Sequence, residues 1–151
     1  MAVTITSVAA SGVAPRSLQA TSTGRLWVAV AHSSANIIEF WYSDDAGATW
    51  TENTAAQFAW SGDQYFAFYI DADDHAHIAY DELGPVALKY RRNKSISTTS
   101  AWSAASTVDS TTATSYQWAD LVAHREGTGW KAHILYKRNT TGTDLMLYAP
   151  I

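Results

Sequence analysis

Residues 43–50 read Ser43-Asp44-Asp45-Ala46-Gly47-Ala48-Thr49-Trp50, which is the pattern of a turn that caps itself. A short acidic side chain such as that of Asp45 can accept hydrogen bonds from the backbone N–H groups of its own loop, and Gly47 tolerates a positive φ. The six residues before the turn, 37–42, are β-branched or aromatic apart from one glutamate, and Trp50 begins another extended segment. The pattern therefore predicts a strand, a capped turn and a second strand.

Five positions of this turn also match a known signature. Ser43, Asp45, Gly47, Thr49 and Trp50 occupy the fixed positions of the pattern S-x-D-x-G-x-T-W. In this respect the chain resembles the Asp-box repeats of bacterial neuraminidases and other sialidase-like β-propellers. The resemblance implies an all-β propeller in which these five residues are structural, because in that family the box lies on the edge of the propeller, away from the ligand face.

Composition favours one folded, all-β domain that spans residues 1–151. Of these residues, 47% are hydrophobic and 13% aromatic, which is enough to bury a core, and only 16% are charged. Seven Trp and eight Tyr suit the pleated surface of a sheet better than a helix. The net charge of -4 and the one basic cluster, at 89–94, give no electrostatic footprint for duplex nucleic acid, and we interpret the cluster as a solvated strand edge.

The sequence predicts no metal site, no cofactor and no membrane span. There is no cysteine, which excludes disulfides and thiolate metal sites. His75 and His77 would share one side of a strand but have no third ligand at an evident spacing, and no phosphate-binding motif occurs. The first residues lack a signal peptide, so an extracellular or virion-associated location would need another export route or release by lysis, and a cytoplasmic location stays open.

Three segments repeat at a spacing of fifty to fifty-six residues. They are 24–30, 74–80 and 130–136, and each has the alternation of a strand that follows a Gly- or Asp-containing turn. With the strand-like runs around them, they predict three four-stranded blades at about 13–57, 63–109 and 115–151. The last blade lacks its fourth strand, and the strand-like run within residues 2–9 is suited to fill such a place.

Three blades are too few for a closed propeller, which has at least four. Two copies of the chain would supply six, so we expect a homodimer that forms one six-bladed ring, in which the N-terminal strand of each copy closes the last blade of the other. Two alternatives stay open at this point. The chain is a fragment of a longer propeller, or it is a small β-sandwich that carries an Asp-box turn.

The resemblance also implies where a ligand would bind. In sialidase-like propellers the ligand face lies opposite the box, on the loops before the inner strands and between the second and third strands. Sugar rings pack their C–H faces on aromatic side chains and need fixed polar partners for their hydroxyls. Trp118 also suits the core, because it adjoins a predicted inner strand. The residues of these loops that suit a glycan are Arg16, His32, Trp60, Asp63, Tyr116, Trp118 and Arg138.

The residues do not favour catalysis. Sialidases hold their substrate's carboxylate with three arginines and use a tyrosine paired with a glutamate as nucleophile, and here only Arg16 resembles one of those arginines. Asp81 and Glu82 are adjacent, so on a strand they point to opposite faces instead of forming a carboxylate pair.

The expected function is therefore a non-catalytic module for carbohydrate binding or assembly. The cysteine-free sequence, rich in Ser, Thr and Ala, is similar to propeller modules of phage tails, which implies a virion component that contacts host surface glycans. The alternatives are a sialidase-like glycoside hydrolase fragment and a purely structural or engineered half-propeller.

Overall fold

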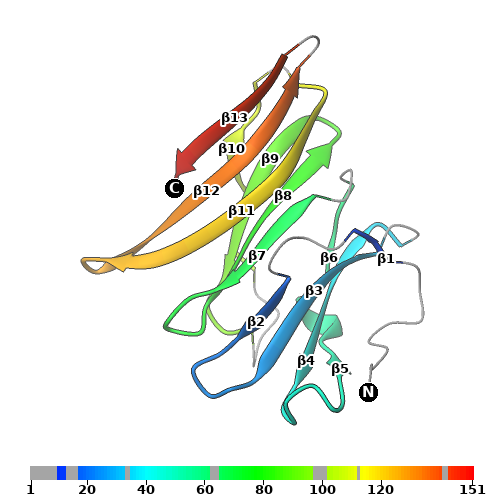
Figure 1. The fold of residues 1–151 in the computed structure, drawn as a ribbon, viewed down its shortest axis with the longest axis vertical. Coiled ribbons are helices and arrows are strands. Elements are labelled where there is room, and N and C mark those ends of the chain that lie inside the picture. The colour runs from blue at the N-terminus through cyan, green and yellow to red at the C-terminus, as the bar shows by residue number, and fades with distance from the viewer. Residues whose placement is uncertain are drawn as a thin grey trace.

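The computed structural model describes residues 10–12, 17–32, 35–61, 65–96, 102–111, 113–140 and 143–151. Within these ranges the chain forms strands in three antiparallel sheets, with one short 3-10 helix, η1 (Thr54–Ala56), and no α-helix (Figure 1). The prediction of an all-β fold is confirmed.

The first sheet is centred on two long strands, β3 (Leu26–His32) and β4 (Ile37–Ser43), which pair along their whole length. Each edge of this sheet is divided between two short strands. These are β1 (Ala10–Gly12) and β2 (Leu18–Ala20) beside β3, and β5 (Thr51–Glu52) and β6 (Phe58–Ala59) beside β4. The sheet is therefore an antiparallel meander with four strand positions, two of them interrupted.

The second and third sheets follow one another along the chain, and each keeps its strands in chain order. The second consists of β7 (Phe66–Ile70), β8 (Ala76–Leu83), β9 (Val86–Asn93) and β10 (Ser106–Asp109). The third consists of β11 (Ser115–Glu126), β12 (Gly129–Thr140) and β13 (Thr143–Pro150). Within the described ranges no strand lies beyond β13. The run that the sequence suggests for that place, at 2–9, lies outside the described residues.

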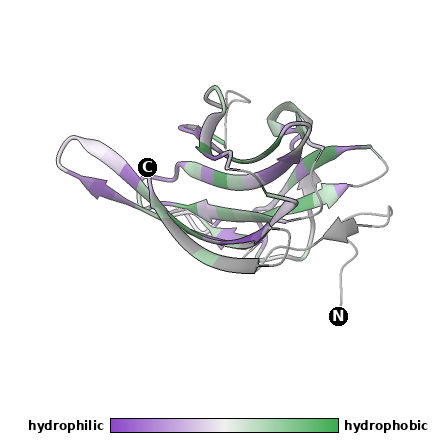
Figure 2. Cartoon of the chain, turned by 90° about the horizontal axis from the view of Figure 1, so that it is seen from above, coloured by the Kyte–Doolittle hydropathy of each residue, from purple (hydrophilic) through white to green (hydrophobic). Residues whose placement is uncertain are grey.

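The second sheet lies between the other two, because side chains on both of its faces are buried. On β7, Phe66, Phe68 and Ile70 pack against the first sheet and form the first core, whereas Ala67 and Tyr69 pack against the third sheet in the second core. Successive strand residues point to opposite faces. One apolar run therefore serves two cores, and Figure 2 looks down on the layers that result.

The turn at 43–50 caps itself as the sequence predicts. Asp45 Oδ1 accepts hydrogen bonds from Ser43 Oγ at 2.7 Å and Thr49 N at 2.8 Å, and Asp45 Oδ2 accepts from Thr49 Oγ1 at 2.6 Å. Ser43 Oγ accepts from Gly47 N at 2.8 Å, and the Trp50 indole N–H donates to Gly47 O at 3.2 Å. Gly47 has a φ of 90°. The hydrogen bonds from Thr49 and Ser43 lower the pKa of Asp45 to about 2.

The hairpin turns that lead into the central strands link the three sheets at one edge. Ser22 N and Ser22 Oγ donate to Asp74 Oδ1 and Oδ2, both at 2.6 Å, and join the β2–β3 turn to the β7–β8 turn. Arg125, at the end of β11, forms an ion pair with Asp73 at 3.6 Å. Gly24 and Asp74 occupy the same place in two of the repeats, and both have a positive φ, of 85° and 62°.

Candidate functional site

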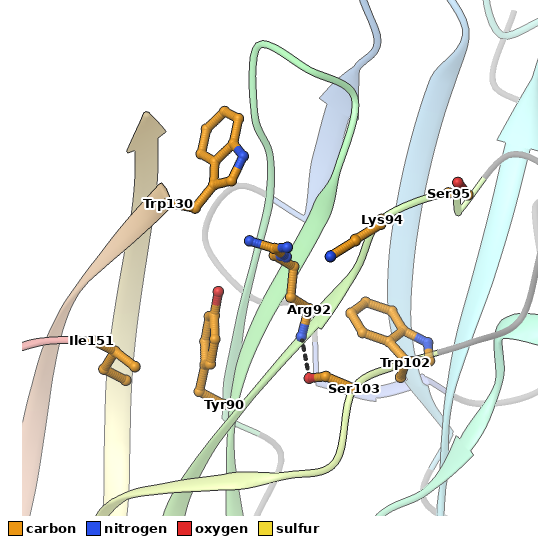
Figure 3. A pocket seen from close by; sticks show the side chains of 8 residues that line it. All are labelled: Tyr90, Arg92, Lys94, Ser95, Trp102, Ser103, Trp130 and Ile151. Carbon is orange, nitrogen blue, oxygen red and sulfur yellow. Dashed lines mark hydrogen bonds between the residues drawn. The ribbon is translucent and has the colours of Figure 1, made fainter. Parts of the chain in front are cut away.

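A cleft of about 590 Å³ lies where the second sheet meets the third, at the edge that also carries the linked hairpins. Figure 3 shows side chains that converge on it from β9, from the turn that follows β9, and from β12. The residues that line it are Tyr90, Arg92, Lys94, Ser95, Trp102, Ser103, Trp130 and Ile151.

Two half-buried tryptophans form the walls of the cleft, and each is held by its neighbours. The Trp102 indole N–H donates to Ala56 O at 2.7 Å, and its ring lies 5.2 Å from that of Phe40. The Trp130 ring packs edge-on against His75 at 5.4 Å, and it lies 6.1 Å from His77. Each ring packs against the protein on one side and is only half-buried, so part of its surface is open to the cleft.

The alternation of side chains along β9 directs cations toward the cleft. Tyr90 and Arg92 lie on the face of the strand that meets the third sheet, since they pair with Ala79 and His77 of β8, and Lys94 follows just beyond the strand. The side chains of Arg92 and Lys94 point toward one another in the cleft (Figure 3). In the described part of the chain, no carboxylate is seen in an ion pair with either of them.

A buried hydrogen-bonded chain supports Tyr90 from below. The Tyr90 hydroxyl lies 2.7 Å from His77 Nδ1, and His77 Nε2 lies 2.7 Å from Asp71 Oδ2. The carboxylate accepts at Asp71 Oδ1 from two backbone N–H groups, those of Asp73 and His75, so the proton between Asp71 and His77 is assigned to His77 Nε2. His77 Nδ1 is then the acceptor, and Tyr90 donates to it.

Burial determines the protonation states of His77 and Tyr90 in this hydrogen-bonded series. It lowers the pKa of His77, although the Asp71 carboxylate opposes that effect, and it raises the pKa of Tyr90 to about 12. At neutral pH the imidazole is therefore neutral and the phenol protonated. The Tyr90 hydroxyl has its hydrogen directed at His77, which leaves its oxygen as an acceptor toward the cleft.

Two of the ligand residues expected from the sequence come together at the opposite edge of the sheets. Tyr116 and Arg138 are direct cross-strand partners in β11 and β12. Arg138 Nη1 donates to Asp109 Oδ2 at 3.1 Å, as does the Tyr136 hydroxyl at 2.9 Å. Burial works to raise the pKa of Asp109, but the hydrogen bonds from Thr111 and Tyr136 and the charge of Arg138 leave it lowered.

The sequence-based placement of Trp60 and Tyr116 on an open ligand surface is corrected by their burial. Trp60 is 4% exposed and lies in the first core, where its indole N–H donates to Asp81 O at 2.9 Å. Tyr116 is 1% exposed in the second core, and burial raises its pKa to about 12. Trp60 follows β6, which pairs with β4, so the sheet edge carries its ring into the layer between sheets. Neither ring presents a face to a sugar.

The other expected ligand residues are not gathered into one site. His32 Nδ1 lies 2.6 Å from Glu39 Oε1, beside the Trp41 indole N–H, which donates to Glu39 Oε2 at 3.1 Å. Arg16, Asp63 and the side chain of Trp118 lie outside the described residues. Among the residues that the structure describes, no three His, Cys, Asp or Glu side chains are grouped to hold a metal ion.

The cleft itself was missed by the sequence analysis, which interpreted 89–94 as a solvated edge. Lys89 and Arg91 do lie on the other face of β9, where Lys89 bonds to Thr107 Oγ1 and Arg91 to the Tyr80 hydroxyl. Arg92 turns into the cleft instead. The available signal was the alternation of Tyr90, Arg92 and Lys94, which places an aromatic ring and two cations on one side.

Comparison with known proteins gives this chain no family. No protein-family model matches it, and no curated protein matches it in sequence. No helix in the described ranges is both long and apolar enough to cross a membrane. A functional proposal therefore depends on the geometry of the sheets and of the cleft.

Proposed function

We propose that this chain is a non-catalytic module of β-propeller type, in which two copies close into one ring that presents a surface for carbohydrate recognition. In this proposal each sheet is a blade, so a pair of chains supplies six, within the four to eight of known propellers. The observation that carries it is a contrast between buried and exposed side chains at equivalent positions of the three sheets.

The outer face of the third sheet exposes apolar residues at positions that the second sheet buries. Leu135 and Met146 are 46% and 60% exposed. By the repeat and the strand pairing, their equivalents in the second sheet are Ala79 and Leu88, which the third sheet covers and which are 0% and 1% exposed. Val122, on the same outer face, is 41% exposed. Exposed apolar groups gathered on one face favour an interaction surface.

The outer face of the first sheet also exposes an apolar residue whose equivalents in the other two sheets are buried. Leu18 pairs with Val28 as Phe68 pairs with Ile78 and Leu121 with Ile134, so these three residues are equivalent. Phe68 and Leu121 are covered by the preceding sheet and are 1% and 2% exposed, whereas Leu18 is 55% exposed. The first sheet thus has a face suited to a preceding sheet.

A second copy of the chain is the partner that fits both faces. If the third sheet of one copy packed on the first sheet of the other, the contact would repeat between chains the packing of sheet on sheet found within one chain. A contact between two different faces generates a closed ring when the rotation returns to its start.

The lining of the cleft favours recognition over catalysis. Glycoside hydrolysis commonly needs two carboxyl groups on either side of the scissile bond, and among the described residues that line the cleft there is no Asp or Glu. The raised pKa of Tyr90 also works against a phenolate nucleophile near neutral pH. An extracellular or virion setting remains part of the proposal through the resemblance described for the sequence.

Solution mass tests the ring directly. Analytical ultracentrifugation is expected to give about twice the chain mass of 16.5 kDa. Leu135→Glu places a charge on the outer face of the third sheet and Leu18→Glu on that of the first, and each is expected to yield folded monomers. Ala105→Glu, at an exposed position just before β10, is the matched control and should leave the dimer intact.

Three results would contradict the proposal. A wild-type monomer at concentrations of tens of micromolar would remove the ring and leave the fragment alternative. An unchanged mass for both face variants would show that the copies meet elsewhere. Turnover of a fluorogenic sialoside, lost on Tyr90→Phe, would replace recognition by hydrolysis.

A further inference from the structure

We propose that the cleft binds an anionic sugar unit, with the carboxylate or sulfate of the ligand between Arg92 and Lys94 and the sugar ring on Trp130. The site lies on the edge of the sheets opposite to the Tyr116 and Arg138 cluster. All of its residues come from one chain, so the inference goes beyond the ring and does not depend on it.

The arrangement of the two cations points to an anion. Arg92 is half-buried and its side chain converges with that of Lys94 in the cleft (Figure 3). Lys94 is exposed, and the described part of the chain pairs neither cation with a carboxylate. A carboxylate or sulfate between them would gain charge-assisted hydrogen bonds from both, including a two-pronged bond from the guanidinium.

The aromatic walls indicate that the anion is part of a ring-bearing ligand. Trp130 and Trp102 are half-buried, and the contacts of Trp130 with His75 and His77 fix its orientation before any ligand arrives. A pre-formed wall costs little conformational entropy on binding. The cleft volume of about 590 Å³ lies within the ordinary range for small-molecule sites. A simple inorganic anion would leave both indoles unused.

The polar groups between the walls suit sugar hydroxyls. Tyr90 directs its own hydrogen at His77, so its oxygen accepts a hydrogen bond from the ligand. Ser103 Oγ lies beside Arg92 N at 3.1 Å, and Ser95 borders the same space. A ligand that carries a hydroxyl next to its charged group can therefore bond to Tyr90 while its anion contacts Arg92.

Isothermal titration calorimetry on the full chain tests this site with defined probes. Tri-galacturonate presents the carboxylate, and its methyl ester removes only the charge. Galactose 6-sulfate presents the sulfate form of the same chemistry, and sodium sulfate presents the anion without a ring. The variants are Lys94→Gln, Arg92→Gln and, as a control, Arg125→Gln, whose side chain is 63% exposed outside the cleft.

At least one anionic sugar is expected to bind, and the methyl ester to bind about tenfold more weakly or worse. Lys94→Gln and Arg92→Gln should each weaken the anionic sugar about ten- to hundredfold, with Arg125→Gln unchanged. Since Lys94 is exposed, its variant stays informative if Arg92→Gln does not fold.

The inference is overturned if neither anionic sugar binds, if the ester binds as tightly as the acid, or if Lys94→Gln has no effect. Sodium sulfate binding as tightly as the sugars would reduce the site to an anion site and also overturn it. The mass measured on the same samples separates this failure from that of the ring. A dimer without sugar binding rejects the cleft alone, and a monomer that binds rejects the ring alone.

Discussion

The Tyr90 hydroxyl lies 2.7 Å from His77 Nδ1, and through His77 the wall of the cleft is joined to the carboxylate of Asp71 beneath it. His77 is 0% exposed. The three side chains therefore form one unit, in which the surface group is oriented by two groups that solvent does not reach.

Removal of the Tyr90 hydroxyl is expected to destabilise the fold. Tyr90→Phe keeps the ring but leaves His77 Nδ1 buried without its donor, and an unsatisfied buried acceptor costs about 1–3 kcal/mol. Urea unfolding followed by tryptophan fluorescence measures the loss. Tyr42→Phe, on β4 and partly buried, is a suitable control. Equal stability of the two variants would contradict the role of the hydroxyl.

Mild acid is expected to destabilise the protein through His77. Burial lowers the pKa of His77 below its ordinary 6.5, so below about pH 6.5 the unfolded chain binds a proton that the folded chain does not. The midpoint of thermal unfolding should fall between pH 7 and pH 5. His77→Gln, although less stable overall, should flatten that slope, whereas His124→Gln at an exposed position should retain it. A slope that persists in His77→Gln would assign it to another group.

Stronger acid is expected to release the capped turn. The folded pKa of Asp45 is about 2 against an ordinary value of 3.8, so its carboxylate stabilises the fold above pH 4 and this contribution is lost as the pH falls toward 2. Asp45→Asn should be less stable at pH 6 and should show a smaller further loss between pH 4 and pH 2. Asp73→Asn, which removes an exposed ion pair with Arg125, serves as the control. Parallel curves for wild type and Asp45→Asn would count against the cap.

The two equivalent residues Phe68 and Leu18 are expected to differ in their effect on stability. Phe68→Ala opens a cavity in the first core and should lower the free energy of unfolding by about 3–5 kcal/mol. Leu18→Ala removes a side chain that is 55% exposed, and should cost less than about 1 kcal/mol in dilute solution. Chemical denaturation at submicromolar concentration measures both. Similar costs would mean that the first sheet is covered in a single chain.

Local residue patterns were sufficient to predict the strands and the capped turn. The run at 65–70 predicts an extended segment, and β7 occupies Phe66–Ile70 with alternate residues on two cores. The side chains around Asp45 make the turn because every partner lies within five residues of it. Such short-range features depend on propensity and hydrogen-bonding chemistry that the sequence states directly.

Features that depend on long-range packing could not be predicted in the same way. Trp60 stands before Ser61 and Gly62 and has the surroundings of a loop residue, but the pairing of β6 with β4 buries it between sheets. The cleft combines Tyr90 of the second sheet with Trp130 of the third and with Trp102, which packs on Phe40 of the first sheet, so its residues are brought together only by packing between sheets. No local sequence pattern indicates which strands of different sheets become neighbours.

Asp71 has two structural roles, and any substitution of this residue changes both. With Oδ1 it accepts from Asp73 N and His75 N and so fixes the reversal between β7 and β8, and with Oδ2 it fixes the tautomer of His77. A substitution that relaxes this corner would therefore also release the phenol that faces the ligand. The shape of a surface bend and the chemistry of a binding wall are thus inherited together through a single carboxylate.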